Sequence, residues 1–295
     1  MNKLFLRLVV VLIVCAAIVI GITLATQSNS LKIVDYPAML VLAVIAFAIQ
    51  WVVFIPAYAL QTEKFYDLTG SLTFITILAV SVTALSQMSW YQIALALMVG
   101  VWALRLGTFL FARILKDGAD NRFDDIKPNP IRFFTAWTIQ GLWVFLTSAA
   151  VTVALVSLTI VDFDSTYTMT SLVVGGAFWI IGFVLEVVAD AQKRQFKKQK
   201  DTGSSFIKSG LWRVSRHPNY FGEILLWFGA AIFALPALAG WQHIVLISPL
   251  FVTLLLTKVS GVPLLEKKAD AKFGHLDEYQ DYKKATPVLI PRVKS

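Results

Sequence analysis

Apolar residues gather in long runs along this chain, and short polar segments separate the runs. Eight runs are long enough to cross about 30 Å of hydrocarbon as helices of roughly 20 residues. They predict helices at approximately Leu4 to Ala25, Pro37 to Leu60, Leu68 to Leu85, Trp90 to Leu115, Arg132 to Ile160, Thr170 to Ala191, Pro218 to Leu235 and Trp241 to Val259. A tight connection is expected at Pro236 to Gly240. The pattern therefore predicts an all-α, polytopic membrane helix bundle.

Composition supports a single membrane bundle. Apolar residues make up 57% of the 295 residues, charged residues 15%, and the mean hydropathy is +0.71. Average soluble proteins contain about 45–50% apolar and about 25% charged residues. The formal net charge of +8 lies in clusters between the apolar runs, which favours an anionic membrane surface over nucleic acid as its partner. Cys15 is the only cysteine, which excludes a disulfide and a cysteine-based metal site.

The basic residues predict the orientation of the bundle. Apart from Lys32 and Arg105, every Lys and Arg falls in or beside segments that eight spans would place on one side. By the positive-inside rule, both termini are expected in the cytoplasm, with the chain in a bacterial inner (plasma) membrane. We expect residues 1–30 to form an N-terminal transmembrane helix and residues 31–295 one membrane domain. The first run could instead be a signal peptide, although it is long for one.

Ionisable residues inside apolar runs are costly to insert into a membrane, and each is a functional candidate. Arg105 lies in the middle of the fourth run and needs a partner. Asp67, at the inner start of the third run, is the expected partner, and Tyr66 beside it could donate a hydrogen bond. The alternative is a structural salt bridge that only joins two helices.

A second polar stripe follows the sixth run. Glu186, Asp190, Arg194 and Lys197 have the spacing that places them on one helix face, running from the apolar part toward the cytosol. Ion pairs on a solvated helix end would explain the two basic members. Glu186 lies deeper in the run, so it must meet a polar partner or a polar ligand.

The densest polar cluster precedes the seventh run. Pro218 suits the first position of a helix, with Ser215 or His217 at its cap, and Asn219, Tyr220 and Glu223 follow within two turns. A helix N-terminus favours an anion, and three neighbouring basic residues add charge: Lys208, Arg213 and Arg216. The cluster predicts a site for a ligand that carries phosphate or carboxylate. A basic anchor for anionic lipid is the alternative.

The C-terminal tail is too polar to span and is expected to fold back as a helix and an extended strap. Glu266 could approach the His–Pro cluster, and Tyr279 or Tyr282 could stack on an aromatic ligand or pack at the interface. A further charged stretch, residues 116–125, faces the same side. Because it lacks EF-hand spacing, no metal site is expected there. Together these segments predict a soluble cofactor bound from the cytosol and a lipidic substrate bound from the bilayer.

The residues 216–223, Arg-His-Pro-Asn-Tyr-Phe-Gly-Glu, together with the tail from Phe273-Gly274 to Pro291, resemble the C-terminal region of the membrane steroid 5α-reductase superfamily, and within it the bacterial members of unknown function. The resemblance implies a seven-helix core, to which the first helix is an addition. It also implies reduction of a carbon–carbon double bond conjugated to a ketone, with NADPH held on the cytoplasmic side.

The resemblance also assigns residues by position. It implies NADPH contacts from Arg122, Glu186, Asp190, Lys197, Asn219, Tyr220 and Glu223, with Arg213, Arg216, His217 and Glu266 close to them. The family pair that polarises the substrate falls at Asp67 and Trp102. Because Trp cannot donate a proton there, Tyr66 is the hypothetical donor beside Asp67, and Trp102 and Arg105 are expected to contact the hydrophobic substrate.

The same His–Pro–x–Tyr motif resembles isoprenylcysteine carboxyl methyltransferases, which bind S-adenosylmethionine. In that alternative His217, Tyr220 and Glu266 would shape the site for the carboxylate and the amine of this cofactor. The sequence Glu186 to Asp190 and the charged 116–125 stretch favour the reductase. A non-enzymatic, lipid-binding membrane protein is the third hypothesis.

Overall fold

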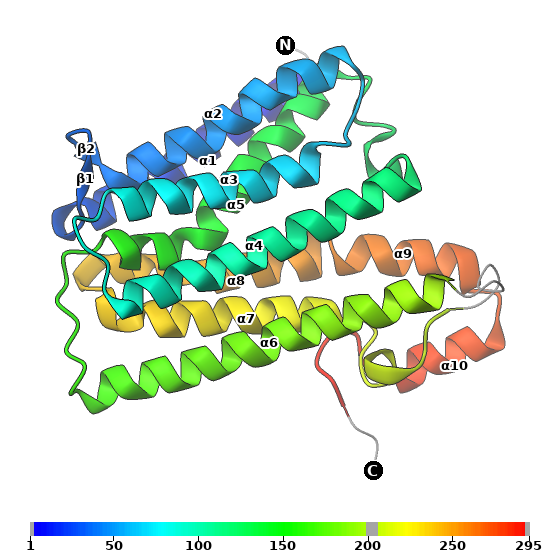
Figure 1. Ribbon diagram of the computed structural model, residues 1–295. Coiled ribbons are helices and arrows are strands. Elements are labelled where there is room, and N and C mark those ends of the chain that lie inside the picture. Colours follow the sequence, from blue (N-terminus) through cyan, green and yellow to red (C-terminus); the bar gives the residue numbers. More distant parts are fainter. Residues whose placement is uncertain (1–2, 199–205, 293–295) are drawn as a thin grey trace. The chain divides into compact units, whose positions relative to one another are not determined.

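A computed structural model describes residues 3–198 and 206–292 of the chain (Figure 1). Its α-helices are α1 (Lys3–Thr26), α2 (Ala38–Ala59), α3 (Tyr66–Thr83), α4 (Trp90–Asp117), α5 (Pro130–Val156), α6 (Thr166–Lys198), α7 (Pro218–Ala234), α8 (Ile247–Leu254), α9 (Val262–Phe273) and α10 (Asp277–Ala285). The only strands in the described part, β1 (Lys32–Ile33) and β2 (Tyr36–Pro37), form one short antiparallel hairpin. Eight helical segments of these residues are long and apolar enough to cross a membrane, which confirms the predicted all-α membrane bundle.

Polar side chains cap the N-termini of two of the membrane-length helices. Ser89 and Gln92 form a reciprocal capping box at the start of α4, with each side chain accepting from the other's backbone N–H. Asn129 accepts from the first backbone N–H groups of α5, and Pro130 occupies the first helical position. Both helices therefore begin where the sequence offers a side chain to satisfy their free amides.

The last predicted helix, Trp241 to Val259, is not continuous. The segment starts as the 3₁₀ helix η6 (Gly240–Leu246), becomes α-helical in α8 and ends as the π-helix η7 (Leu255–Val259). Pro249 lies in the first turn of α8, where its missing N–H is tolerated. An α-helix that began at Trp241 would have Pro249 in its interior, so the tighter 3₁₀ form precedes it.

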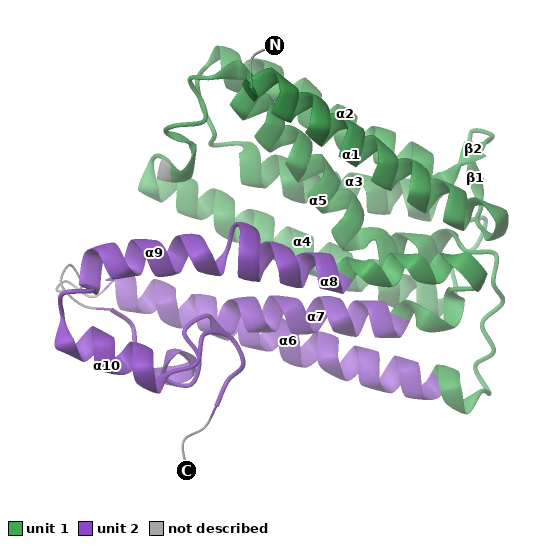
Figure 2. Cartoon of the chain, turned by 180° about the vertical axis from the view of Figure 1, so that it is seen from behind, with its two compact units in different colours: residues 1–168, 234–248 green, residues 169–233, 249–295 purple. Residues whose placement is uncertain are grey.

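The chain divides into two compact units (Figure 2). Unit 1 comprises residues 1–168 and 234–248, and unit 2 comprises residues 169–233 and 249–295.

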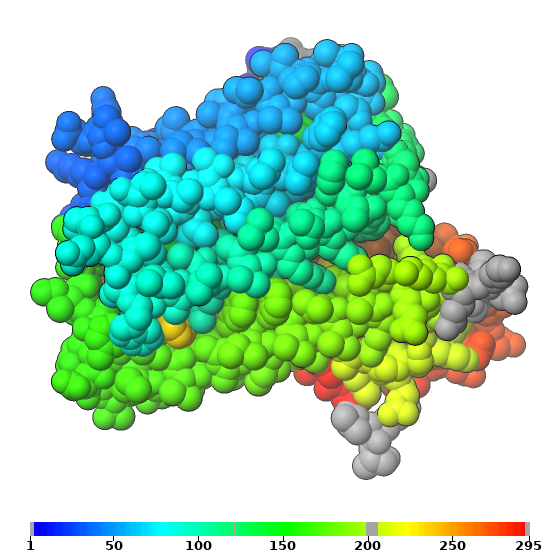
Figure 3. Space-filling model, in the orientation of Figure 1, coloured from blue at the N-terminus to red at the C-terminus, as the bar shows by residue number. Residues whose placement is uncertain are grey.

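Unit 1 is a bundle of α1 to α5 with α5 at its centre. The most apolar stretch of α5 is 89% buried, whereas that of α1 is only 22% buried. On one face of the unit α3 and α4 lie side by side (Figure 3). Buried amides join the helices: Gln50 donates to Thr73 at 2.8 Å, and Gln140 donates to the Tyr66 carbonyl at 2.8 Å. Such hydrogen bonds help to hold membrane helices together, because lipid is as apolar as the helices and the hydrophobic effect does not drive their association.

Unit 2 is built on a close approach of α6 and α7. Gly175 and Gly182 on α6 lie against Gly229 and Gly222 on α7, and both pairs are seven residues apart along their helices. A Cβ atom added to Gly182 would lie 2.5 Å from the backbone N of Leu226 and 2.6 Å from the carbonyl oxygen of Gly222. The two backbones are therefore in direct contact, as small residues permit between membrane helices.

Candidate functional site

The segment before α7 is fixed against the end of α6. The Gln192 side chain accepts a hydrogen bond from the Leu211 backbone N–H at 2.9 Å, and the Trp212 indole donates to the Ala189 carbonyl at 3.1 Å. Gly210 has a φ of +60°, and a Cβ there would lie 2.6 Å from the Gln192 amide. Glycine is needed for this turn, which leads the chain back toward Arg216 and His217.

The start of α7 follows the prediction. The helix begins at Pro218, and the hydroxyl of Ser215 accepts from the His217 backbone N–H at 3.2 Å. The same hydroxyl donates to the Leu289 carbonyl at 2.7 Å. Ser215 therefore links the beginning of α7 to the C-terminal part of the chain.

We call residues 286–292 the C-terminal strap, and it lies along the segment before α7. Backbone hydrogen bonds join Arg216 N to the Pro287 carbonyl at 2.9 Å and Arg292 N to the Val214 carbonyl at 3.0 Å. From α10, the Tyr282 hydroxyl donates to the Trp212 carbonyl at 2.6 Å. The tail thus folds back and ends in an extended strap, as the sequence predicts, but it forms two helices, α9 and α10, where one was expected.

Arg216 and Glu266 form a fork-shaped ion pair at the centre of this region. Arg216 donates from Nη2 to Glu266 Oε2 at 2.8 Å and from Nε to Oε1 at 3.2 Å. Its Nη1 donates to the carbonyls of Lys283 and Thr286, at 2.7 and 2.9 Å. Paired, charge-assisted hydrogen bonds of this kind are strong and directional. One guanidinium therefore joins α9, α10 and the strap.

His217 is buried and held on two sides. Its Nε2 lies 2.9 Å from Glu266 Oε1, and its ring stacks on Tyr220 with centroids 5.7 Å apart and an interplanar angle of 11°. Its Nδ1 is buried and has no hydrogen-bond partner among the described residues. The same holds for Asn219 Oδ1, whereas Asn219 Nδ2 donates to Asp190 at 3.2 Å. Two buried polar atoms at the start of α7 thus lack hydrogen-bond partners among the described residues, as expected where a ligand would supply them.

A cavity of 530 Å³, which we call the lysine pocket, lies beside this network. Lys193 and Lys197 of α6 and Lys268 and Lys272 of α9 line it, in both cases one helical turn apart. Arg216 adds a fifth cation, and Glu266 is the one carboxylate among the described residues of the lining. The remaining walls are mainly aromatic or apolar: Phe196, Phe206, Ile207, Trp212, Leu265, Ala269, Phe273, Tyr279 and Tyr282.

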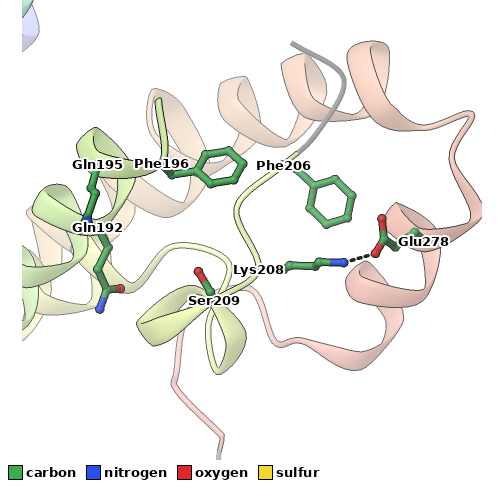
Figure 4. Close-up of a pocket in the computed structure, with 7 residues that line it drawn as sticks. All are labelled: Gln192, Gln195, Phe196, Phe206, Lys208, Ser209 and Glu278. Atoms are coloured by element: carbon green, nitrogen blue, oxygen red, sulfur yellow. Dashed lines mark hydrogen bonds and ion pairs between the residues drawn. The ribbon is translucent and has the colours of Figure 1, made fainter. Parts of the chain in front are cut away.

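A second cavity, of 450 Å³, shares Phe196 and Phe206 with the lysine pocket (Figure 4). Its polar lining consists of Gln192, Gln195, Lys208, Ser209 and Glu278, and Lys208 pairs with Glu278. The Phe206 ring lies against Phe273, Tyr279 and Tyr282 with centroids 5.1–5.8 Å apart.

Tyr279 is held in its neutral form. Burial, together with its hydrogen bond to Asp270 at 3.1 Å, raises the pKa of Tyr279 to about 12. It therefore remains a hydrogen-bond donor throughout the physiological pH range.

Unit 1 has a charged cluster of its own at the ends of α3 and α4. Asp67 lies 3.5 Å from Arg113 and 3.5 Å from Arg122, and Arg122 lies 2.6 Å from Asp120. The predicted pairing of Asp67 with Arg105 is wrong, because the register of α3 and α4 sets Ser71 against Gly107. Asp67 is one turn from Ser71, so it reaches the level of Arg113.

Two further residues of unit 1 extend this cluster. Glu63 accepts from the backbone N–H of Asp120 at 2.8 Å and pairs with Lys127. Burial opposes ionisation of Glu63, but the Lys127 and backbone hydrogen bonds outweigh it, so the pKa of Glu63 is lowered. Burial likewise opposes ionisation of Asp120, and Arg122 outweighs it, so the pKa of Asp120 is also lowered. Both carboxylates are stabilised as anions.

The other predicted residues of unit 1 lie inside its bundle. Tyr66 donates to the Ala136 carbonyl at 3.0 Å and packs between Phe123 and Trp137. Trp102 is fully buried against Phe74, with ring centroids 5.2 Å apart. The Arg105 guanidinium lies 5.2 Å from the centre of the Phe109 ring.

In unit 2 the structure brings several predicted residues together and separates others. Arg216, His217, Tyr220 and Glu266 are in contact, Asn219 contacts Asp190, and Lys197 lines the lysine pocket. Glu186 and Glu223 are buried on α6 and α7, whereas Arg213 is exposed.

Sequence reasoning missed Lys193, Lys268 and Lys272 of the lysine pocket and Glu63, Arg113 and Lys127 of the charged cluster. The i,i+4 spacing of Lys268 and Lys272 was the available signal for the tail. Nothing in the sequence indicated that these two lysines share a cavity with Lys193.

Comparison with known proteins gives a family and distant relatives. The family described as "Protein of unknown function (DUF1295)" matches residues 51–286. The chain is 31% identical over 120 residues to "3-oxo-5-alpha-steroid 4-dehydrogenase 1" of Rattus norvegicus and 28% identical over 117 residues to that of Mus musculus, in each case covering 40% of both chains. It is 40% identical over 58 residues to "Steroid 5-alpha-reductase DET2" of Gossypium hirsutum, covering 20% of this chain and 22% of that protein. The chain thus spans about two-fifths or less of these relatives' length. No solved structure matches.

Proposed function

This chain belongs to the DUF1295 family and is a polytopic membrane protein distantly related to steroid 5α-reductases, and from this premise we propose that it is an NADPH-dependent reductase of a lipidic enone. The proposed reaction reduces a carbon–carbon double bond conjugated to a ketone. The names of the relatives support the reaction class, and the lysine pocket supports the choice of cofactor.

The charge of the lysine pocket is the observation that carries the proposal. Among the described lining residues, two lysine pairs and Arg216 oppose a single carboxylate, Glu266, which is itself paired with Arg216. Like charges one turn apart destabilise a helix unless an anion compensates them. NADPH carries a pyrophosphate and a third phosphate, whereas S-adenosylmethionine carries a sulfonium cation. The pocket also has a volume within the roughly 300–1,000 Å³ of small-molecule sites.

The chain's own groups would bind and orient the reactants. Bound NADPH would supply a hydride to the β-carbon of the enone, and a proton taken up from water would complete the reduction at the α-carbon. We assign Tyr66 as the hydrogen-bond donor to the substrate carbonyl. In that role its hydroxyl would donate to the substrate instead of to the Ala136 carbonyl. Asp67, fixed by Arg113 and Arg122, would hold the polar end of the substrate site in place. Trp102 and Arg105 remain proposed substrate contacts.

The remaining predicted residues are proposed cofactor contacts. Arg216 and Lys197 line the lysine pocket, and Asn219 Oδ1 is buried without a hydrogen-bond partner among the described residues. We keep Arg122, Glu186, Asp190, Arg213, Tyr220 and Glu223 as candidates on the resemblance alone.

We also propose that both termini lie in the cytoplasm of a bacterial cell, so that the cofactor enters from the cytosol. The distribution of Lys and Arg supports this orientation. Fusions of a reporter that fluoresces only in the cytoplasm, placed after Ala59 and after Thr83, test it. Fluorescence of the first and not the second is expected, and the reverse pattern would invert the topology.

The cofactor is tested by thermal titration of the full-length protein in lipid nanodiscs with NADPH, NADP⁺ and S-adenosylmethionine. A ligand at 100 times its dissociation constant should stabilise by about 2.7 kcal/mol. Stabilisation by the nicotinamide nucleotides is expected. Stabilisation by S-adenosylmethionine alone would make the chain a methyltransferase, and stabilisation by none would favour a lipid-binding role.

Variants of the lysine pocket locate the binding. The double variant Lys193→Ala, Lys272→Ala removes one cation from each helix and should weaken NADPH at least tenfold, given the strength of charge-assisted phosphate contacts. Lys284→Ala is the matched control, because this lysine does not line the pocket. Equal affinity of both variants would refute this pocket as the phosphate site.

A further inference from the structure

The hydrogen-bond network around His217 determines which of its ring nitrogens carries a proton. Nε2 lies 2.9 Å from Glu266 Oε1, and both Glu266 oxygens also accept from Arg216. A carboxylate held by a guanidinium can only accept, so the hydrogen of the contact must belong to Nε2. In the neutral ring, Nδ1 then carries a lone pair.

The position of Nδ1 makes this tautomer significant. Nδ1 is buried without a partner among the described residues, and His217 lines the lysine pocket. A buried lone pair without a donor is unfavourable, and native structures satisfy nearly all such groups. A phosphate offers no hydrogen at neutral pH, so it cannot satisfy the Nδ1 lone pair of the neutral ring.

We propose that His217 Nδ1 accepts a hydrogen bond from an N–H or O–H group of the bound ligand, and that Glu266 and Arg216 are positioning residues that hold His217 in the Nε2–H tautomer. The inference rests on the proposed function, in which the ligand is NADPH. The donor is then the nicotinamide carboxamide or a ribose hydroxyl. His217 would thereby recognise a nucleoside part of the ligand, while the lysines bind its phosphates.

Two neighbouring contacts support this division of roles. The Tyr220 ring stacks on His217 and fixes the plane of its ring, so the direction of the Nδ1 lone pair is set before a ligand arrives. Arg216 fixes Glu266 through both carboxylate oxygens, so Oε1 cannot rotate away from Nε2. Preorganised acceptors of this kind discriminate strongly between ligands that have and lack the matching donor.

The ¹⁵N NMR spectrum of the imidazole rings tests the tautomer. The chain has only three histidines, so His243→Asn and His275→Asn variants assign the signals of the full-length protein in nanodiscs. We expect Nδ1 of His217 to resonate as an unprotonated nitrogen in the ligand-free protein, and to shift toward the hydrogen-bonded position when NADPH saturates it. A proton on Nδ1, or an Nδ1 signal unmoved by bound NADPH, would overturn the inference.

Variants test the positioning role. Glu266→Gln should produce a mixture of tautomers and weaken NADPH about tenfold, the loss expected for one hydrogen bond. Asp270→Asn is the matched control, because it removes a carboxylate one turn further along α9 that pairs with Tyr279 and Lys283. It should leave the His217 tautomer unchanged. The same tautomer in both variants would show that Glu266 does not set it.

A pair of substitutions keeps the test valid if Glu266→Gln folds poorly. His217→Asn retains an acceptor near the position of Nδ1, whereas His217→Gln retains a polar atom near Nε2. The first variant should keep part of the affinity for NADPH, and the second should lose it. The reverse order would refute Nδ1 as the ligand contact.

The NADP⁺ analogue with a 3-acetylpyridine ring identifies the donor, because a methyl ketone replaces its carboxamide. If the analogue saturates the protein without moving Nδ1, the carboxamide is the donor; if it moves Nδ1 as NADP⁺ does, a ribose hydroxyl is. Binding of S-adenosylmethionine alone would refute the proposed function, whereas the tautomer is still measured in the ligand-free protein. The two failures are therefore distinguishable.

Discussion

Replacing Arg216 with alanine should destabilise unit 2 more than a surface change on the C-terminal tail does. The variant removes two hydrogen bonds to Glu266 and two to the carbonyls of Lys283 and Thr286. The Arg216 and Glu266 side chains are only 11% and 19% exposed, so Glu266 would keep its charge in a largely dry site with His217 as its nearest partner.

The magnitude follows from that burial. Removing one partner of a buried pair costs about 3–5 kcal/mol. The Lys283 ammonium lies 4.0 Å from Glu266 and would still stabilise its charge, so we expect the lower end, about 3 kcal/mol. At about 2–4 °C for each kcal/mol in proteins of similar size, the melting midpoint should fall by roughly 6 °C or more.

The assay is thermal unfolding of purified protein in nanodiscs, with Lys284→Ala as the matched control. Lys284 pairs with Asp281 at 4.0 Å, and these side chains are 78% and 80% exposed, so its loss should shift the midpoint by about 1 °C or less. Arg216→Lys keeps the charge but loses the paired hydrogen bonds to Glu266, so its melting midpoint should lie between those of the two alanine variants. Equal midpoints for Arg216→Ala and Lys284→Ala would refute the central role of the ion pair.

Two further predictions concern the helix contact and the charged cluster. Gly182→Ala should destabilise by about 1–3 kcal/mol because its Cβ meets the backbone of α7, whereas Gly21→Ala, with open space around it, should be neutral or stabilising; equal melting midpoints would contradict the close contact. Because the pKa values of Glu63 and Asp120 are lowered in the folded state, their stabilisation is complete above the unfolded values near 4 and is lost as the pH falls below them. Unfolding measured between about pH 5 and 3 should show this loss, and Glu63→Gln should reduce it; an unchanged slope would count against Glu63 as an ionised partner of Lys127.

Apolar runs predicted the long helices well because the bilayer imposes a length that few other patterns satisfy. The run from Trp241 to Val259 is the exception. Hydropathy does not distinguish α from 3₁₀ or π backbone, and Pro249 decides where the α-helical part begins. Pro249 is visible in the sequence, but the length and hydropathy of an apolar run do not register it.

The candidate site was partly predictable. The cluster from Arg213 to Glu223 is contiguous, so its gathering at the start of α7 follows from the chain itself. The lysine pocket is different, because it depends on α9 lying across from α6, which no single sequence specifies. The pairing of Asp67 failed for a similar reason, since the register of α3 against α4 depends on the small residues Ser71 and Gly107.

The glycine contacts of α6 and α7 have a consequence for how this protein could change its ligand during evolution. Gly182 and Gly222 leave no layer of side chains between the two helices, so neither helix can shift without breaking a backbone contact. Lys193 on α6 and His217, which immediately precedes α7, therefore belong to a wall of the pocket whose backbone is fixed. Lys268 and Lys272 on α9 form the wall that can vary, and new ligand preferences should arise there first.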